Sequence, residues 1–130
     1  MKKRFGIKGF FIVISITICV HAFGVSIWSR NYGGAGTDIA NSIQQTSDSG
    51  YVVAGRSDSF THGDYDFMIY KLDSNGNKIW SKFYGGADLD VAESIQQTSD
   101  DGYVVAGYSK SFTHGAGDFM IYKLNANGDK

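Results

Sequence analysis

The sequence contains no proline and a single cysteine, Cys19, in 130 residues. One cysteine excludes an internal disulfide framework and a metal site built from several cysteines. Charged residues make up only 19% of the chain and hydrophobic residues 42%, which excludes a disordered chain because so apolar a sequence can bury a core. The 17 glycines and the 15% aromatic share instead indicate an all-β protein of one modest domain.

The first 22 residues have the composition of a secretory signal peptide. A basic stretch, residues 2–8, precedes an apolar run over residues 10–20, and the small residue Ala22 follows. This order predicts a signal peptide at residues 1–22 that is cleaved near Ala22. The sequence therefore predicts a secreted or cell-surface protein.

Two other uses of this N-terminal stretch are less favoured. An uncleaved membrane anchor needs about 20 apolar residues, more than the run supplies. Lipidation of Cys19 needs a small residue before it, and Ile18 stands there. Removal of the signal peptide takes away four basic residues and no acidic one, so the net charge falls from −1 to −5. An acidic chain is poorly suited to phosphate backbones, so no nucleic-acid partner is expected.

The remaining chain consists of two near-identical repeats. Residues 28–78 align with residues 80–130 without a gap, and 37 of the 51 aligned positions are identical. The stretch SIQQTSDSGYVVAG recurs as SIQQTSDDGYVVAG, with Ser49 replaced by Asp101. A fixed period of this size that carries several short strands indicates a repeat architecture.

Each repeat predicts four short strands rich in β-branched and aromatic residues. They are residues 42–46 and 94–98 (SIQQT), 51–55 and 103–107 (YVVAG), 66–72 and 118–124 (DFMIYKL), and 78–85 (KIWSKFYG). YVVAG is apolar without alternation, as in a strand covered on both faces. DFMIYKL alternates, which places Phe119 and Ile121 on one face and Met120, Tyr122 and Leu124 on the other.

The connections between these strands differ in kind. SDDG and SNGN predict tight turns, whereas GGADLDVAE and SKSFTHGAG are longer loops. Successive antiparallel strands reverse direction, so both tight turns lie at one end of the sheet and both long loops at the other. We expect a binding site at the long-loop end. Four antiparallel strands per repeat are typical of a β-propeller blade, with a β-solenoid as the alternative fold.

The repeats resemble the blades of secreted bacterial and archaeal β-propeller proteins. Those blades read approximately W-S-K-x-Y-G-G, then S-I-Q-Q-T-x-D-G-G-Y-V-V-A-G, then D-x-x-I-x-K-L-D-x-x-G, and the matching residues here are 80–86, 94–107 and 118–128. The resemblance implies an all-β fold of two four-stranded blades and an extracytoplasmic location, but no defined reaction. It divides the chain into residues 23–79, an N-terminal strand plus blade 1, and residues 80–130, the last strand of blade 1 plus an incomplete blade 2.

Two blades cannot close a propeller, which typically has four to eight. The N-terminal stretch VSIWSRNYG resembles the last strand of a blade, and the second blade lacks that strand. Either identical chains associate head to tail through their blade faces, or the sequence is a fragment that continues in further blades. Both interpretations stay open at this point.

Several polar residues recur at equivalent positions of the predicted long-loop end. The candidate ligand-binding residues are Asp38, Asp90, His62, His114, Asp66, Asp118 and Tyr108. The aspartates predict either caps on loop amides or a ring of carboxylates at a pore mouth. One imidazole per repeat does not make a metal site, and no cofactor motif is present, so neither a metal nor a cofactor is expected.

No catalytic residues are predicted, because the sequence contains no recognisable nucleophile and base pair. Near-identical repeats place the same groups at repeated points, which suits multivalent binding better than catalysis. We expect a non-catalytic binding or structural protein with a glycan or surface ligand. The alternatives are a truncated propeller fragment with no function of its own and a glycan-processing enzyme.

Overall fold

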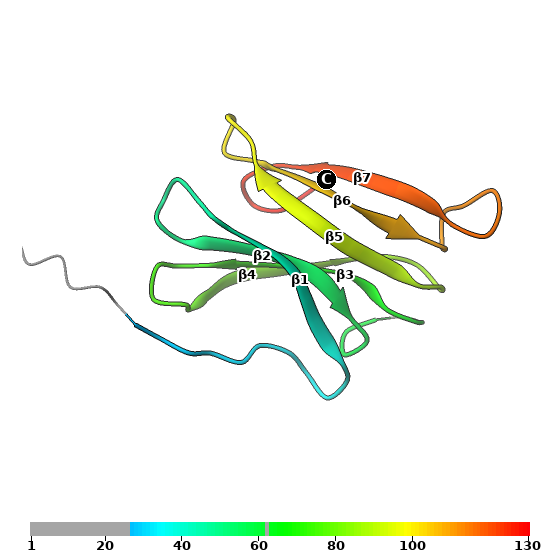
Figure 1. The fold of residues 1–130 in the computed structure, drawn as a ribbon, viewed down its shortest axis with the longest axis horizontal. Helices are drawn as coiled ribbons and strands as arrows, with labels where there is room; N and C mark the ends of the chain where they lie inside the picture. Colours follow the sequence, from blue (N-terminus) through cyan, green and yellow to red (C-terminus); the bar gives the residue numbers. More distant parts are fainter. Residues whose placement is uncertain (1–26, 62) are drawn as a thin grey trace, which may run out of the picture.

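The computed structural model describes residues 27–61 and 63–130, in which all regular structure is β. The seven strands are β1 (Asp38–Gln45), β2 (Tyr51–Ser57), β3 (Asp66–Leu72), β4 (Lys78–Tyr84), β5 (Asp90–Gln97), β6 (Tyr103–Ser109) and β7 (Asp118–Leu124). They form two antiparallel sheets in sequential order, β1-β2-β3-β4 (sheet A) and β5-β6-β7 (sheet B), as Figure 1 shows. Within the described ranges there is no helix that is long and apolar enough to span a membrane.

The expected all-β class and strand order are confirmed. β3 and β7 have the predicted bounds, while β1 and β5 begin four residues earlier than predicted and β2 and β6 end two residues later. The extra pairing is made across a β-bulge in each first strand, between Ala40 and Ser42 and between Ala92 and Ser94. A bulge lets a strand bend and continue, which a purely alternating pattern does not predict.

Sheet A has the four strands of a complete unit, and sheet B has three, as expected for an incomplete second unit. One expectation about strands is wrong within the described residues. Residues 27–33, the described part of the stretch VSIWSRNYG that is expected as a strand, adopt no strand structure, although the equivalent residues 79–85 include most of β4. A β-strand forms only where a second strand can hydrogen-bond to its backbone. β4 has β3 as this partner, whereas residues 27–33 have no strand beside them among the described residues.

The two sheets stack face to face, with β5 against β1 and β2 (Figure 1). We call the side of sheet A that carries Phe67 and Ile69 its back face, and the side of sheet B that carries their counterparts Phe119 and Ile121 the back face of sheet B. The other side of each sheet is its front face. The back face of sheet A packs on the front face of sheet B, where Val105 and Leu124 lie. The strands β2 and β3 are buried on both faces, as the apolar run of β2 predicts.

The predicted division of the chain is only partly visible in the structure. The predicted signal peptide, residues 1–22, lies outside the described residues. The boundary between residues 79 and 80 falls inside β4, so the second sequence repeat begins within sheet A. The sequence repeat is therefore shifted by one strand relative to the sheets.

Candidate functional site

Asp38 and Asp90 occupy equivalent positions at the start of β1 and β5. One oxygen of Asp38 accepts hydrogen bonds from Gly34 N at 2.9 Å and Ser59 Oγ at 2.7 Å. Asp90 repeats this arrangement, at 2.9 Å from the nitrogen of Gly86 and 2.6 Å from the hydroxyl of Ser111. Each carboxylate thus joins the loop before its own strand to the loop after the next strand, which is the geometry of a loop cap.

The environment of Asp38 favours its ionised form. Burial disfavours the charge, but hydrogen bonds from Ser57, Gly34 and Ser59 together outweigh this effect and lower the pKa of Asp38. Asp38 also lines two shallow hollows of about 240 and 390 Å³ beside Tyr32. Asp38 therefore adjoins open space on the front face of sheet A.

Asp66 and Asp90 come together between the two sheets. A methyl group on Gly85 would collide with Asp66 Oδ1 and would lie 2.8 Å from Asp90 Oδ2. Both carboxylates are buried. Burial and then the charge of Asp90 raise the pKa of Tyr122, which lies on the adjoining strand β7. The sequence pattern placed these aspartates at one end of the sheets, but it did not show that they meet.

The remaining predicted residues do not join this pair. Asp118, the counterpart of Asp66, is exposed at the start of β7, where it accepts a hydrogen bond from His114 N at 3.4 Å. Tyr108 donates its hydroxyl to Ala116 O at 3.2 Å and so supports the same loop. His62 lies outside the described residues. In residues 27–61 and 63–130 no three His, Cys, Asp or Glu side chains are grouped in a way that could hold a metal ion.

A different site is present at the tight-turn end, between the two sheets. This inter-sheet groove has a volume of about 350 Å³. Its lining includes Asp48, Lys71 and Trp80 from sheet A and Gln97, Asp101 and Asn127 from sheet B. The sequence does not reveal this groove, because it exists only where two tight turns from different repeats face each other.

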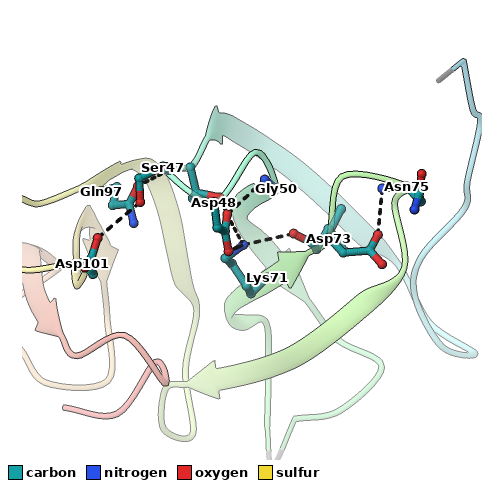
Figure 2. A network of polar contacts seen from close by, with 10 residues as sticks. Ser47, Asp48, Gly50, Lys71, Asp73, Asn75, Gln97 and Asp101 are labelled. Atoms are coloured by element: carbon teal, nitrogen blue, oxygen red, sulfur yellow. Dashed lines mark hydrogen bonds and ion pairs between the residues drawn. The ribbon is translucent and has the colours of Figure 1, made fainter. Parts of the chain in front are cut away.

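An ion pair between the buried Lys71 and the exposed Asp48 forms one wall of the inter-sheet groove. Lys71 is only 5% exposed, and its ammonium lies 2.8 Å from the carboxylate of Asp48 and 3.1 Å from the carbonyl oxygen of Leu72. The hydrogen bonds from Lys71 and then Thr46 lower the pKa of Asp48 to about 2. Figure 2 shows Lys71 pointing toward Asp48 and its turn. This wall therefore presents a carboxylate that is fixed in position and ionised near neutral pH.

Direct hydrogen bonds connect the two turns that border the inter-sheet groove. Ser47 N donates to Gln97 Oε1 at 2.8 Å, and Ser47 Oγ donates to Asp101 Oδ1 at 3.2 Å (Figure 2). Asp101 has a positive φ of 59°, a conformation that aspartate tolerates better than most residues. The bonds hold Asp101 at the groove, where the first repeat has Ser49 at the equivalent position.

Trp80 supplies the aromatic surface of the inter-sheet groove. Its ring packs edge-on against Tyr103, with centroids 5.9 Å apart and planes at 71°. A methyl group on Gly128 would lie 2.9 Å from the indole, so the turn of sheet B fits closely against it. Trp80 is nevertheless only half-buried. The groove thus combines one aromatic surface with carboxylates and amides that both donate and accept hydrogen bonds.

Comparisons with known proteins give no further guide to the groove. No protein-family model matches the chain, and no curated protein matches it.

Proposed function

We propose that this protein is a secreted or cell-surface, non-catalytic binding protein in which sheets A and B are successive blades of a β-propeller. The sequential strand order and the face-to-face contact of the two sheets support the blade arrangement. The equal spacing of the repeats supports it as well, since one unit follows another at a constant offset.

The ligand that best suits the inter-sheet groove is a glycan. A sugar ring has an apolar face that stacks on an indole and a rim of hydroxyls that need both donors and acceptors. Trp80 supplies the first, and Asp101, Gln97 and Asn127 supply the second. The groove volume of about 350 Å³ lies within the usual range for small-ligand sites. This combination is the observation that carries the proposal.

The test is a glycan array followed by calorimetric titration of the best ligand. Asp101→Ser is the informative variant, because Ser49 occupies the same turn position with the same positive φ and the turn should still form. We expect affinity to fall about tenfold, the effect of one lost charged hydrogen bond of about 1.4 kcal/mol.

The matched control removes an aspartate elsewhere. Asp88→Ser makes the same chemical change in an exposed loop at the opposite end of the sheets and should leave affinity unchanged. Absence of binding across a broad glycan array would remove the proposal. Equal affinities of the wild type and Asp101→Ser would show that the ligand binds elsewhere.

A further inference from the structure

Identical residues of the two sheets differ in burial on their back faces. In sheet A, Phe67 and Ile69 are 0% exposed because sheet B covers them. In sheet B, their counterparts Phe119 and Ile121 are 83% and 58% exposed. The back face of sheet B is therefore an exposed apolar surface, and sheet A shows what kind of surface the same residues pack against.

The front face of sheet A also exposes a residue that is buried at the equivalent position of sheet B. Ile43 on β1 is 62% exposed, whereas its counterpart Ile95 is 5% exposed beneath sheet A. A hollow of about 290 Å³ lies beside Ile43 and is also lined by Trp28, Tyr32 and Val53. The molecule thus carries two open surfaces, and each has the residues of one half of the contact between sheets A and B.

The contact between sheets A and B shows how these two surfaces would fit. Phe67 packs edge-on against Tyr122 at a centroid distance of 5.4 Å, and it also lies over Gly107. The corresponding three residues are Phe119 on sheet B and Tyr70 and Gly55 on sheet A. Tyr70 and Gly55 are buried, but Tyr70 lines a hollow of about 240 Å³ on the front face of sheet A. All three are identical to their templates, so Phe119 can enter a second chain as Phe67 enters sheet B.

The N-terminal segment, residues 27–34, lies on the front face of sheet A as β4 lies on the front face of sheet B. Trp28 packs edge-on against Tyr51 with centroids 5.7 Å apart, the counterpart of Trp80 on Tyr103. Tyr32 donates its hydroxyl to Gly76 O at 2.6 Å.

The equivalent bond in the second repeat runs from Tyr84 to the carbonyl oxygen of Gly128. Residues 27–34 therefore lie on sheet A as β4 lies on sheet B. No strand corresponding to β3 lies beside them among the described residues.

We propose that the back face of sheet B and the outer edge of β7 bind a second copy of this chain. The front face of sheet A of the second copy covers Phe119 and Ile121, and its residues 28–32 add to β7 as a fourth strand. In sheet A, Phe67 pairs with Tyr84 and Ile69 with Lys82. The same register pairs Phe119 with Tyr32 and Ile121 with Arg30 of the second copy, an example of strand addition to a free sheet edge.

Polar groups of the inner strands are also available for this contact. Between the sheets, Gln97 N donates to Gln44 Oε1 at 2.6 Å, and Ser47 N donates to Gln97 Oε1 at 2.8 Å. The residues that would repeat these bonds are Gln96 and Ser99 of one chain and Gln45 of the next. One bond is not repeated, because Glu93 stands at the position of Asn41, whose side-chain amide donates to the carbonyl oxygen of Ala92.

The contact would also complete a second groove. Lys123 and Asp100 of sheet B correspond to Lys71 and Asp48, and they already form an ion pair of 2.8 Å. The second copy would add Trp28 and Asn75 in the places of Trp80 and Asn127, and this consequence alone rests on the proposed function. Because the contact joins unlike surfaces, it is heterologous and can repeat from chain to chain. Two to four chains would give about four to eight blades, the range in which propellers close.

The first experiment measures the mass of the purified protein in solution by light scattering and sedimentation. We expect the wild type to have two to four times the chain mass, or a mass that grows with concentration if the ring does not close. Ile121→Asp damages the back face of sheet B, and Ile43→Asp damages the front face of sheet A. Each variant alone should have the mass of a single chain.

Ile79→Asp is the matched control for these variants. Ile79 is 56% exposed, similar to Ile121, but it lines the inter-sheet groove rather than the proposed contact. This variant should keep the wild-type mass. Circular dichroism and thermal melting confirm that all three variants are folded. A wild type that has the mass of a single chain at every concentration overturns the proposal, whether or not it binds a glycan.

Mixing the two damaged variants tests that the contact joins unlike surfaces. Ile43→Asp retains an intact back face on sheet B, and Ile121→Asp retains an intact front face on sheet A. The mixture should form a 1:1 complex of twice the chain mass. Association of Ile43→Asp with itself would show that back faces pair with each other, and failure of the mixture to associate would also contradict the proposal.

A disulfide trap provides a readout that does not depend on damaged surfaces. In chains in which Cys19 is replaced by Ser, Arg30→Cys is mixed with Ile121→Cys under mild oxidation. The predicted register brings these two positions opposite each other, so a disulfide-linked dimer should form. Ile79→Cys replaces Ile121→Cys in the control, which should remain unlinked to Arg30→Cys. Equal linkage in both mixtures would overturn the register.

Discussion

Phe67 and Phe119 occupy the same position in two identical DFMIYKL strands, yet the first is 0% exposed and the second 83% exposed. Sheet B covers Phe67 and β4 lies beside it, whereas β7 is an edge strand with no sheet behind it among the described residues. A repeat protein with few units has this property at its ends, where a residue of the core pattern faces solvent or a partner.

Phe67→Ala and Phe119→Ala form a matched pair that measures this difference. Phe67→Ala should lower the free energy of unfolding by about 3–5 kcal/mol, because it leaves a cavity between the sheets. Phe119→Ala should change the stability of the isolated chain by less than about 0.5 kcal/mol, as expected at an exposed position. Urea denaturation at a low protein concentration gives both values.

The two variants should also respond differently to protein concentration. The loss in Phe67→Ala is internal to one chain and should not depend on concentration. The loss in Phe119→Ala should grow as concentration rises, since association stabilises the wild type by mass action. Equal losses in both variants at low concentration would mean that Phe119 is covered within its own chain.

The ion pairs Lys71–Asp48 and Lys123–Asp100 are chemically identical but differ in exposure. The side chain of Lys71 is 6% exposed and that of Lys123 is 51% exposed. Asp48→Asn leaves a buried ammonium with the Leu72 carbonyl, so we expect a loss of roughly 1 kcal/mol, a value reduced because Asp48 itself is more than half exposed. Asp100→Asn should cost less, because water can solvate Lys123. Chemical denaturation of the two variants at neutral pH tests the difference.

The ion pair between Lys71 and Asp48 also predicts how the stability of the protein changes in acid. The pKa of Asp48 is lowered from 3.8 to about 2, so the folded protein holds this proton less tightly than the unfolded chain. Its contribution is therefore complete above about pH 4 and is lost as the pH falls from 4 to 2. Thermal melts across this interval should show a smaller drop in Asp48→Asn than in the wild type. An unchanged drop would show that other carboxylates dominate acid unfolding.

The strand order and the two-faced pattern of β3 and β7 could be predicted because they depend on local features. Tight turns, β-branched residues and the alternation of DFMIYKL are properties of each repeat by itself. The bulges at the start of β1 and β5 could not be predicted from alternation. The state of residues 27–34 could not be predicted either, because the same sequence pattern forms a strand only where a partner strand is present.

The candidate sites illustrate the same limit. Asp38 and Asp90 were expected at the long-loop end either as caps or as a carboxylate ring, and their hydrogen bonds to Gly34 and Gly86 are those of caps. The inter-sheet groove depends on Trp80 of one sheet facing Asp101 of the next, at the end where only tight turns were expected. Such a juxtaposition is set by how repeats stack, and the pattern within one repeat contains no signal for it.

Gly85 lies against two buried carboxylates, Asp66 of its own sheet and Asp90 of the next, and has little room for a side chain. An alanine there would collide with Asp66 Oδ1 and approach Asp90, and both carboxylates are buried, so neither can move into water without losing its contacts. Overpacking of this kind costs about 1–3 kcal/mol, and we expect Gly85→Ala to lower the free energy of unfolding by about 2 kcal/mol. Gly115→Ala is the control, because no atom lies within 4 Å of the added methyl group and stability should stay within about 0.5 kcal/mol of the wild type. Denaturant titration of both variants measures the contrast.

A double variant separates the effect of volume from that of charge at this position. Asp66→Asn combined with Gly85→Ala should recover less than half of the loss in the free energy of unfolding, because the amide is as large as the carboxylate it replaces. Full recovery would mean that charge repulsion between Asp66 and Asp90, rather than the volume of the methyl group, sets the cost at this position.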